Sequence, residues 1–298
     1  MDIFKDTKSF FYITLIIFLS STTYIRNIVW GNGLTLWEDV VKNAPQKERG
    51  HNNLGIAYDE IQNRLDEAMK EYLTALRINP YYPEAHHNLG NVYLKEGRID
   101  EAVKEYETVL RLEPAYAKAY NSLGVAYFKQ GRIDDAIIKY LTALRLKPFF
   151  PEAHNNLGNA YAEQNRFDEA IKEYLKALEI STDYANAHYN LGNAYYNQGR
   201  LDEAAREYLT ALKINPKETE AHNNLGFVYY SLGRMDEAIK EYLTALGLKP
   251  DNVDAHYNLG RAYKTKGLKE EAKKEFEIVL KLKPDHLQSR QAIEGLKQ

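Results

Sequence analysis

The feature that most constrains the fold is a repeat of 34 residues that runs through most of the chain. Asn-Leu-Gly occurs six times, Ser-Leu-Gly at 122–124 fills the one gap in the series, and the glycines of these motifs from Gly90 to Gly260 follow one another at intervals of 34 residues. With this Gly as position 8, Tyr recurs at position 11, Ala at 20, an aromatic residue at 24 and Pro at 32. Such self-similarity predicts an array of equal structural repeats rather than one or two ordinary globular domains.

Each repeat has the pattern of two helices joined by a tight turn. Leu at position 7 and Tyr at position 11 share one face of the first helix, helix A. Gly at 8 and Ala at 20 leave room for the second helix, helix B, to approach closely. Gly or Asn at position 15 suits a left-handed residue at the end of helix A. Asp at position 18 can accept the N–H groups that open helix B, and Pro at 32 stops that helix.

The pattern Leu-Gly-x2-Tyr, Ala-x3-Tyr/Phe and Pro on a period of 34 resembles the tetratricopeptide repeat (TPR). The resemblance implies an all-α superhelical solenoid of helix–turn–helix repeats, because no single repeat can bury its apolar face alone. We expect a half-repeat helix within 31–47 and a C-terminal capping helix at 287–298. Between them we expect seven repeats, at 48–82, 83–116, 117–150, 151–184, 185–218, 219–252 and 253–286.

The chain begins with an apolar segment. Residues 9–25 carry no charge, and a helix of 17 residues spans roughly 26 Å, a little under the hydrocarbon core of a bilayer. After a tail at 1–8, we therefore predict a transmembrane anchor at 9–30 that ends on the interfacial Trp30. The alternative is a cleaved signal peptide, for which Lys5 and Lys8 form a weak charged region without a small-residue cleavage site after it.

The anchor predicts a single-pass membrane protein whose repeats are extracytoplasmic, in a periplasm or lumen. Cleavage instead predicts a secreted or periplasmic protein. The residues Thr23 to Trp30, with Leu36 to Val41 and Pro45, are similar to the membrane–TPR junction of multi-pass O-mannosyltransferase-like proteins. The catalytic part of that family lies in a many-helix region that this sequence does not contain. The similarity therefore supports the location and not a transferase activity.

Composition and motifs argue against several kinds of function. A net charge of -3 does not favour nucleic acid as a partner, and the absence of Cys excludes disulfides, thiolate zinc sites and cysteine nucleophiles. The motifs of phosphate-binding loops, zinc proteases and serine hydrolases are missing as well. We predict no catalytic residues, no cofactor and no small-molecule substrate, so the chain is not expected to be an enzyme.

Six of the eight histidines recur at position 4, a pattern that suggests a metal ladder. Equivalent points on stacked helices lie about 8–10 Å apart, whereas ligands of one zinc ion each lie about 2 Å from it. We therefore predict packing histidines with a polar tip and no metal site. Carboxylates at positions 19 and 23 are predicted to form a solvated helix face; they include Glu101, Glu105, Glu169, Glu173, Glu237 and Glu241.

Asn recurs at position 6 of helix A, which lines the concave face in the TPR family. A carboxamide both donates and accepts, so it can match a peptide unit. The column resembles the asparagine ladder of the O-GlcNAc transferase superhelix, which binds polypeptide backbone; the alternative is that Asn here is a structural feature of TPR repeats in general. With neighbouring positions 5, 9 and 12, the predicted peptide-binding residues are Asn53, Asn88, Asn156, Asn159, Asn190, Asn193, Asn224, Asn258, Tyr189, Tyr196, Phe227, Tyr230 and Tyr257.

Together these expectations describe a membrane-anchored protein-interaction scaffold that binds an extended partner segment in its concave groove. The alternative is a substrate-recruiting TPR arm of a protein O-glycosylation system whose catalytic chain is encoded elsewhere. A third interpretation is an assembly scaffold that self-associates through the ends of the solenoid. The Lys and Arg pattern with which TPR co-chaperones hold a terminal carboxylate is missing, so chaperone C-termini are not expected partners.

Overall fold

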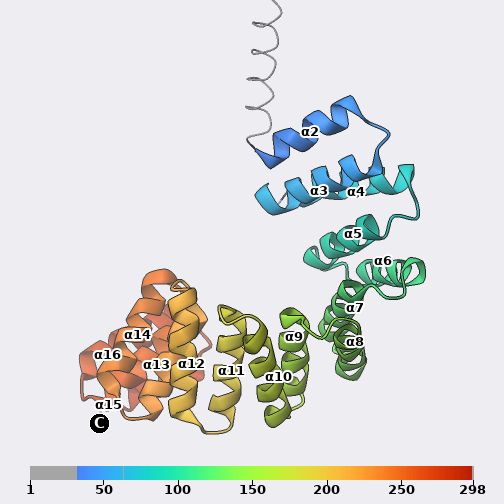
Figure 1. Cartoon of the computed structure of the whole chain (residues 1–298). Helices are drawn as coiled ribbons and strands as arrows, with labels where there is room; N and C mark the ends of the chain where they lie inside the picture. The colour runs from blue at the N-terminus through green and yellow to red at the C-terminus, as the bar shows by residue number, and fades with distance from the viewer. Residues whose placement is uncertain (1–31, 63, 297–298) are drawn as a thin grey trace, which may run out of the picture. The chain divides into compact units, whose positions relative to one another are not determined.

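The computed structural model describes residues 32–62 and 64–296, and every regular element within them is an α-helix (Figure 1). The helices are α2 (Gly33–Asn43), α3 (Glu48–Gln62), α4 (Leu65–Ile78), α5 (Pro83–Lys95), α6 (Ile99–Leu112), α7 (Ala117–Lys129), α8 (Ile133–Leu146), α9 (Pro151–Glu163), α10 (Phe167–Ile180), α11 (Ala185–Asn197), α12 (Leu201–Ile214), α13 (Thr219–Ser231), α14 (Met235–Leu248), α15 (Val253–Thr265), α16 (Lys269–Leu282) and α17 (Leu287–Glu294).

The predicted anchor at 9–30 and the tail at 1–8 lie outside the described residues. Within residues 32–62 and 64–296, none of the helices combines the length and the apolar character that a membrane crossing requires.

The helices form two compact units, an N-terminal unit up to residue 131 with α2–α7 and a C-terminal unit from residue 132 with α8–α17. Within each unit, a helix packs against the next one in the chain, so the helices form a stack of pairs. Helix A of one repeat also contacts helix A of the next, as α9 does with α11 and α13 with α15. The predicted all-α stack of helix–turn–helix repeats is confirmed.

The core of each repeat is built around the aromatic residue at position 24. This ring and the Ala at position 20 are almost completely buried in all seven repeats. In repeat 4, a Cβ added to Gly158 would lie 2.5 Å from Cε1 of Tyr174. The ring therefore occupies the space that any side chain at position 8 would need, which confirms the predicted close approach of the two helices.

The turn after helix A also forms as predicted. The residue at position 15 has a positive φ, between 74° and 78° at five glycines and 59° at Asn165. The next residue is Arg in six repeats. In repeats 1, 2, 4, 5 and 6 its guanidinium stacks on the Tyr at position 11, as Arg98 does on Tyr93 at 4.2 Å. Left-handed residues at this point end helix A and turn the chain toward helix B.

The prediction that Asp at position 18 caps helix B is wrong. Helix B begins one residue earlier, and the residue before it is an Arg that makes no side-chain cap bond, as at Arg98. The Asp lies in the first helical turn and accepts a hydrogen bond from helix A of the following repeat. Gln130 donates to Asp100 at 2.8 Å, and Gln164 donates to Asp134 at 2.7 Å. This carboxylate therefore joins successive repeats.

The first and last helices of the described chain each have a polar side chain as N-cap. The side chain of Asn32 accepts from the backbone N–H of Leu34 at the start of α2. His286 does the same for Ser289 at the start of α17, which packs against α16. Capping side chains of this kind satisfy N–H groups that have no partner inside the helix.

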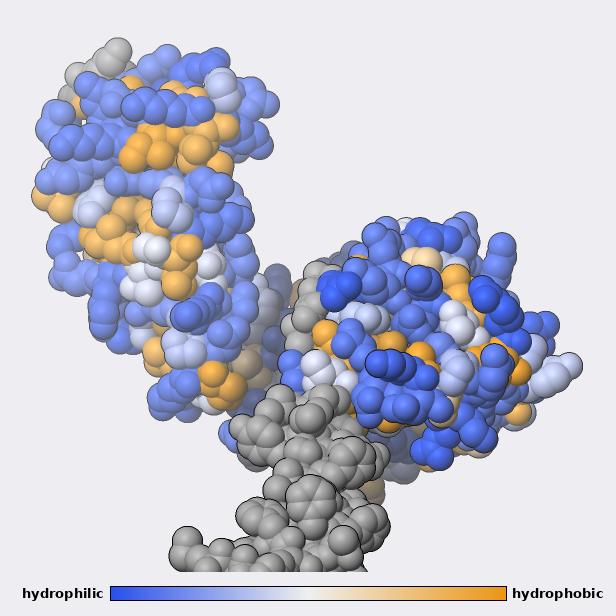
Figure 2. All heavy atoms as spheres, turned by 90° about the horizontal axis from the view of Figure 1, so that it is seen from above, coloured by the Kyte–Doolittle hydropathy of each residue, from blue (hydrophilic) through white to orange (hydrophobic). Residues whose placement is uncertain are grey.

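Most of the surface is hydrophilic, with apolar side chains exposed in patches (Figure 2). Four of the exposed leucines recur at position 25 of helix B in the C-terminal unit; they are Leu141, Leu175, Leu209 and Leu243.

Candidate functional site

All thirteen predicted binding residues lie on helix A of their repeats and are half-buried. Asn53 and Asn88 belong to the N-terminal unit, and the other eleven belong to the C-terminal unit. Eight of these eleven line two cavities of the C-terminal unit. The remaining three are Tyr230, Tyr257 and Asn258, in repeats 6 and 7.

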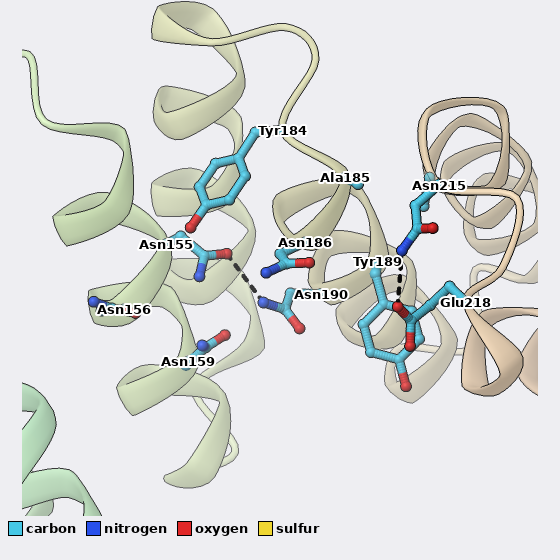
Figure 3. A pocket seen from close by; sticks show the side chains of 11 residues that line it. Asn155, Asn156, Asn159, Tyr184, Ala185, Asn186, Tyr189, Asn190, Asn215 and Glu218 are labelled. Carbon is cyan, nitrogen blue, oxygen red and sulfur yellow. Dashed lines mark hydrogen bonds between the residues drawn. The ribbon is translucent and has the colours of Figure 1, made fainter. Parts of the chain in front are cut away.

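The larger cavity, here the polar pocket, has a volume of about 390 Å³ and lies among α9, α11 and the turn between α12 and α13. Figure 3 shows the amides of Asn155, Asn186 and Asn190 gathered at one side, with Tyr189 and Glu218 at the other. The full lining is Asn155, Asn156, Asn159, Tyr184, Ala185, Asn186, Tyr189, Asn190, Ala211, Asn215 and Glu218.

Seven of these lining residues are outside the predicted set. Three of the seven, Tyr184, Asn215 and Glu218, lie in the turns between repeats rather than on helix A. The only available signal was their place at positions 34, 31 and 34, directly before a helix A. Asn215 donates to the Glu218 carboxylate at 3.1 Å, which holds the turn against the pocket.

The Asn column at position 6 has a structural role in addition to any binding role. Its amide nitrogen donates to the residue at position 5 of the preceding repeat, and the bond recurs in both units. Asn190 donates to Asn155 at 3.0 Å (Figure 3), and Asn258 donates to Asn223 at 3.1 Å. Asn88 donates to Asn52 in the same way, at 3.0 Å. The column therefore links neighbouring repeats, and its amides have a defined orientation.

The Asn at position 9 is held from the opposite side. Its carbonyl oxygen accepts from the hydroxyl of the buried Tyr at position 24, at 2.8 Å from Tyr174 to Asn159 and at 2.6 Å from Tyr208 to Asn193. Burial raises the pKa of both tyrosines, so each hydroxyl keeps the proton that it donates.

Asn193 and Asn224 keep some amide donors and acceptors that these internal bonds do not use. Asn224 donates to both the Tyr189 hydroxyl and the Asn193 carbonyl oxygen, each at 3.1 Å, so its two N–H groups are occupied. The Asn193 oxygen accepts from Asn224 and from Tyr208, so both of its lone pairs are occupied. One Asn193 N–H also reaches the Tyr189 hydroxyl. Among the described residues, no other hydrogen bond uses the second Asn193 N–H or the Asn224 oxygen. The pair therefore presents a donor and an acceptor of fixed polarity.

The second cavity, here the aromatic pocket, has a volume of about 100 Å³ and is lined by Asn193, Tyr196, Tyr208, Asn224 and Phe227. The edge of the Tyr196 ring meets the Phe227 ring at a centroid distance of 5.7 Å. The donor and acceptor left on Asn193 and Asn224 thus lie in the wall of a small, mainly aromatic cavity.

Two other predicted aromatic residues make structural contacts. Tyr257 packs against Phe276 and against His286, with its ring centroid 5.0 Å from that of the histidine. The Tyr189 ring packs on Tyr208 at 5.8 Å. Burial, with smaller contributions from the Glu220 and Glu218 carboxylates, raises the pKa of Tyr189.

The position-4 histidines use both ring nitrogens within the fold. In repeat 5, Nδ1 of His188 lies 2.6 Å from the Glu207 carboxylate and Nε2 lies 3.1 Å from the Thr182 carbonyl oxygen. A carboxylate and a carbonyl oxygen both accept, so the protonated ring of His188, in which both nitrogens donate, satisfies the two bonds together. The hydrogen bond to Glu207 is the largest cause of the raised pKa of His188.

We call this arrangement the histidine clamp; it joins helix A, helix B and the end of the preceding repeat. The same pair of contacts forms at His51, His86, His154, His222 and His256. Within residues 32–62 and 64–296, no cluster of His, Asp and Glu is arranged to hold a metal ion.

The clamp corrects one prediction about the carboxylates. Those at position 19 lie at the surface, with Glu169 and Glu237 exposed and Glu101 half-buried, and pair with the Arg three residues before them, as Glu169 does with Arg166. Those at position 23 are the clamp partners, and Glu173 is buried against His154 at 2.7 Å. Burial opposes ionisation of Glu173, yet the bonds from His154 and Lys176 outweigh it and lower its pKa.

Models of known protein families match most of the chain. The model described as TPR repeat matches residues 61–97, 90–131, 126–165, 158–199, 192–233 and 228–267, and the model described as Tetratricopeptide repeat matches residues 253–286. The chain belongs to the tetratricopeptide repeat family. A comparison with curated proteins gives no match.

Solved TPR structures are similar to this TPR chain. A chain of the APC/C hetero-tetramer Cut9–Hcn1 aligns with a TM-score of 0.73 and 19% identity over 89% of this chain; the match covers 52% of that chain, about half of its length. YrrB, described as a TPR protein with an unusual peptide-binding site, aligns with a TM-score of 0.56 and 23% identity, over 64% of this chain and 99% of its own. MamA aligns with a TM-score of 0.52 and 31% identity, over 54% of this chain and 95% of its own.

Proposed function

We propose that this TPR chain is a protein-interaction scaffold whose C-terminal unit binds an extended partner segment on the helix A face. The observation that carries the proposal is the fixed polarity of Asn193 and Asn224. A donor and an acceptor in one wall match the C=O and N–H of a peptide unit, which every residue of an extended chain presents. Backbone recognition of this kind does not depend on the partner's side chains.

The polar pocket extends the same surface toward repeat 4. The Asn155 and Asn159 oxygens are occupied by Asn190 and Tyr174, so their N–H groups face a ligand's acceptors. The Glu218 carboxylate on the opposite side faces a ligand's donors. The peptide-binding site described for YrrB gives a precedent for this function on the TPR fold.

Filling the polar pocket should abolish partner binding without unfolding the protein. Asn186 is exposed, lines the pocket and makes no hydrogen bond with the described residues, so Asn186→Trp places a large ring in the cavity and removes no internal bond. We expect partner capture from native membranes, measured by crosslinking and mass spectrometry, to fall at least about tenfold. Thermal melting should stay nearly unchanged.

The control is Lys172→Trp on α10, which adds the same ring to an exposed helix B position. It should capture the same partners as the natural protein. Equal capture by Asn186→Trp and by the control would contradict the proposed site.

We further propose that residues 9–30 anchor the chain in a membrane with the repeats outside the cytoplasm. The support is the uncharged segment 9–25 and the Trp that follows it. The full-length chain should stay in the membrane fraction after a carbonate wash. Release of a chain shorter by about 25 residues would show a cleaved signal peptide instead.

A further inference from the structure

Arg261 occupies an unusual place on the helix A face. It lies at position 9 of repeat 7, where repeats 4 and 5 carry Asn159 and Asn193. Its guanidinium carbon lies 4.8 Å from the centroid of the Tyr230 ring and 5.8 Å from that of Phe227. The guanidinium is thus held at the edge of the aromatic cluster by cation–π contacts.

No carboxylate of the described residues forms an ion pair with Arg261. Arg200 and Arg234 of the same unit, by contrast, each pair with the Glu three residues on. A half-buried guanidinium beside a cavity, with its donors unmatched by protein acids, favours an anionic ligand group.

The aromatic pocket beside Arg261 suits one aliphatic side chain. Its volume of about 100 Å³ is smaller than the roughly 150 Å³ of an engineered cavity that binds benzene. Phe227 belongs both to the wall of this pocket and to the cation–π cluster of Arg261. The aliphatic subsite and the cationic subsite are therefore contiguous.

The distance from Arg261 to the pocket wall at Phe227 indicates how close together the two ligand groups lie. The Arg261 guanidinium lies 5.8 Å from the Phe227 ring centroid. In an extended chain, residues i and i+2 point to the same side and lie about 6.5–7 Å apart. An aliphatic residue and an acidic residue two positions away can therefore reach both subsites together.

Charges elsewhere on the face oppose the acidic group. Glu218 lines the polar pocket. The negative charges of Glu218 and Glu220 both raise the pKa of Tyr189. A ligand carboxylate is repelled at the repeat 5–6 turn and attracted at repeat 7, which places the acidic residue of the bound segment at the repeat 7 end.

We propose that the bound segment carries an aliphatic residue in the aromatic pocket and, two residues along the chain, an Asp or Glu that pairs with Arg261. This inference rests on the proposed function and narrows the partner to acidic segments with an aliphatic residue at that spacing.

The inference can be tested with capped eleven-residue peptides in a Gly-Ser background. Their affinity for the full-length chain is measured by fluorescence anisotropy. The probe has Leu-Ser-Glu at its centre, and the comparison peptides have Leu-Ser-Gln, Leu-Ser-Lys and Gly-Ser-Glu. We expect Leu-Ser-Glu to bind at least about tenfold more tightly than Leu-Ser-Lys, because a hydrogen bond to a charged group is worth about that factor. Gly-Ser-Glu should also bind more weakly than the probe.

Arg261→Glu should reverse the preference, so that Leu-Ser-Lys binds more tightly than Leu-Ser-Glu, and Arg261→Gln should remove it. Arg206→Glu on the exposed side of α12 makes the same change in net charge and should behave like the natural protein. Peptides that bind regardless of their charge, with no change in Arg261→Glu, would overturn this inference and leave the proposed function standing. If no peptide binds, or if Asn186→Trp weakens the binding of none of them, both this inference and the proposed function would be overturned.

Discussion

Gly158→Ala is expected to lower the free energy of unfolding of the C-terminal unit by about 2 kcal/mol, the usual effect of adding a methyl group to a filled core. The new Cβ would lie 2.5 Å from Cε1 and 2.7 Å from Cδ1 of Tyr174. The ring has little freedom to move, because it is buried and its hydroxyl is bonded to Asn159 at 2.8 Å. Thermal melting, with hydrogen exchange in α9 and α10, measures the loss.

Gly247→Ala is the matched control. It makes the same substitution within α14, and a Cβ there would meet no atom within 4 Å. We expect a gain of about 0.5–1 kcal/mol from the better helix propensity of Ala. If the two variants melted alike, the close approach at position 8 would not matter for stability.

The histidine clamps should make the repeats more stable at mildly acidic pH than at alkaline pH. Burial opposes the charged ring of His86, but its hydrogen bonds to Glu105 and to the Pro80 carbonyl outweigh it, and its pKa is raised from 6.5. The pKa of His188 is raised as well. A raised pKa contributes stability that is complete below the unfolded value and is lost as the pH rises through the folded value.

The carboxylate partner sets the lower limit of the pH range. The pKa of Glu173 is lowered from 4.5, so its contribution is present above that value and is lost as the pH falls through the folded value. We therefore expect the free energy of unfolding to be greatest between about pH 5 and pH 6.5 and to fall as the pH rises through the folded pKa of the histidines. Denaturant titrations at several pH values measure this dependence.

Removal of one clamp should reduce that dependence. His188→Ala should cost about 2 kcal/mol near pH 6, because a bond to a charged group is lost and Glu207 remains without its partner. The cost should shrink at pH values above the folded pKa of the histidine. Glu203→Gln, which breaks an exposed pair with Arg200, should leave both stability and its pH dependence nearly unchanged. A His188→Ala effect that is constant with pH would show that the ring packs without a charge.

Much of the fold followed from residue types at a fixed spacing. Gly at position 8 and the aromatic residue at position 24 predicted the close helix approach, and Gly or Asn at position 15 predicted the left-handed turn, because each requirement is met by the backbone within one repeat. The capping role of Asp at position 18 was wrong, because its partner is Gln in the following repeat, 30 residues away.

The candidate site was predicted in part. Helix periodicity placed Asn190, Asn193 and Tyr196 on one face of α11, and the structure brings them to two cavities. The same periodicity carries no information about Tyr184 and Glu218, because turn residues reach the pocket through the path of the chain between helices.

The sequence by itself determined the repeat, the helix pairs, the TPR family and the face on which the amides lie, since all of these depend on spacing along the chain. The tertiary structure decided which amide groups remain for a ligand, because that depends on bonds between residues of different helices, such as Asn224 with Tyr189 and Asn193. It also decided that each position-4 histidine forms a clamp, since both of its partners come from outside its own helix.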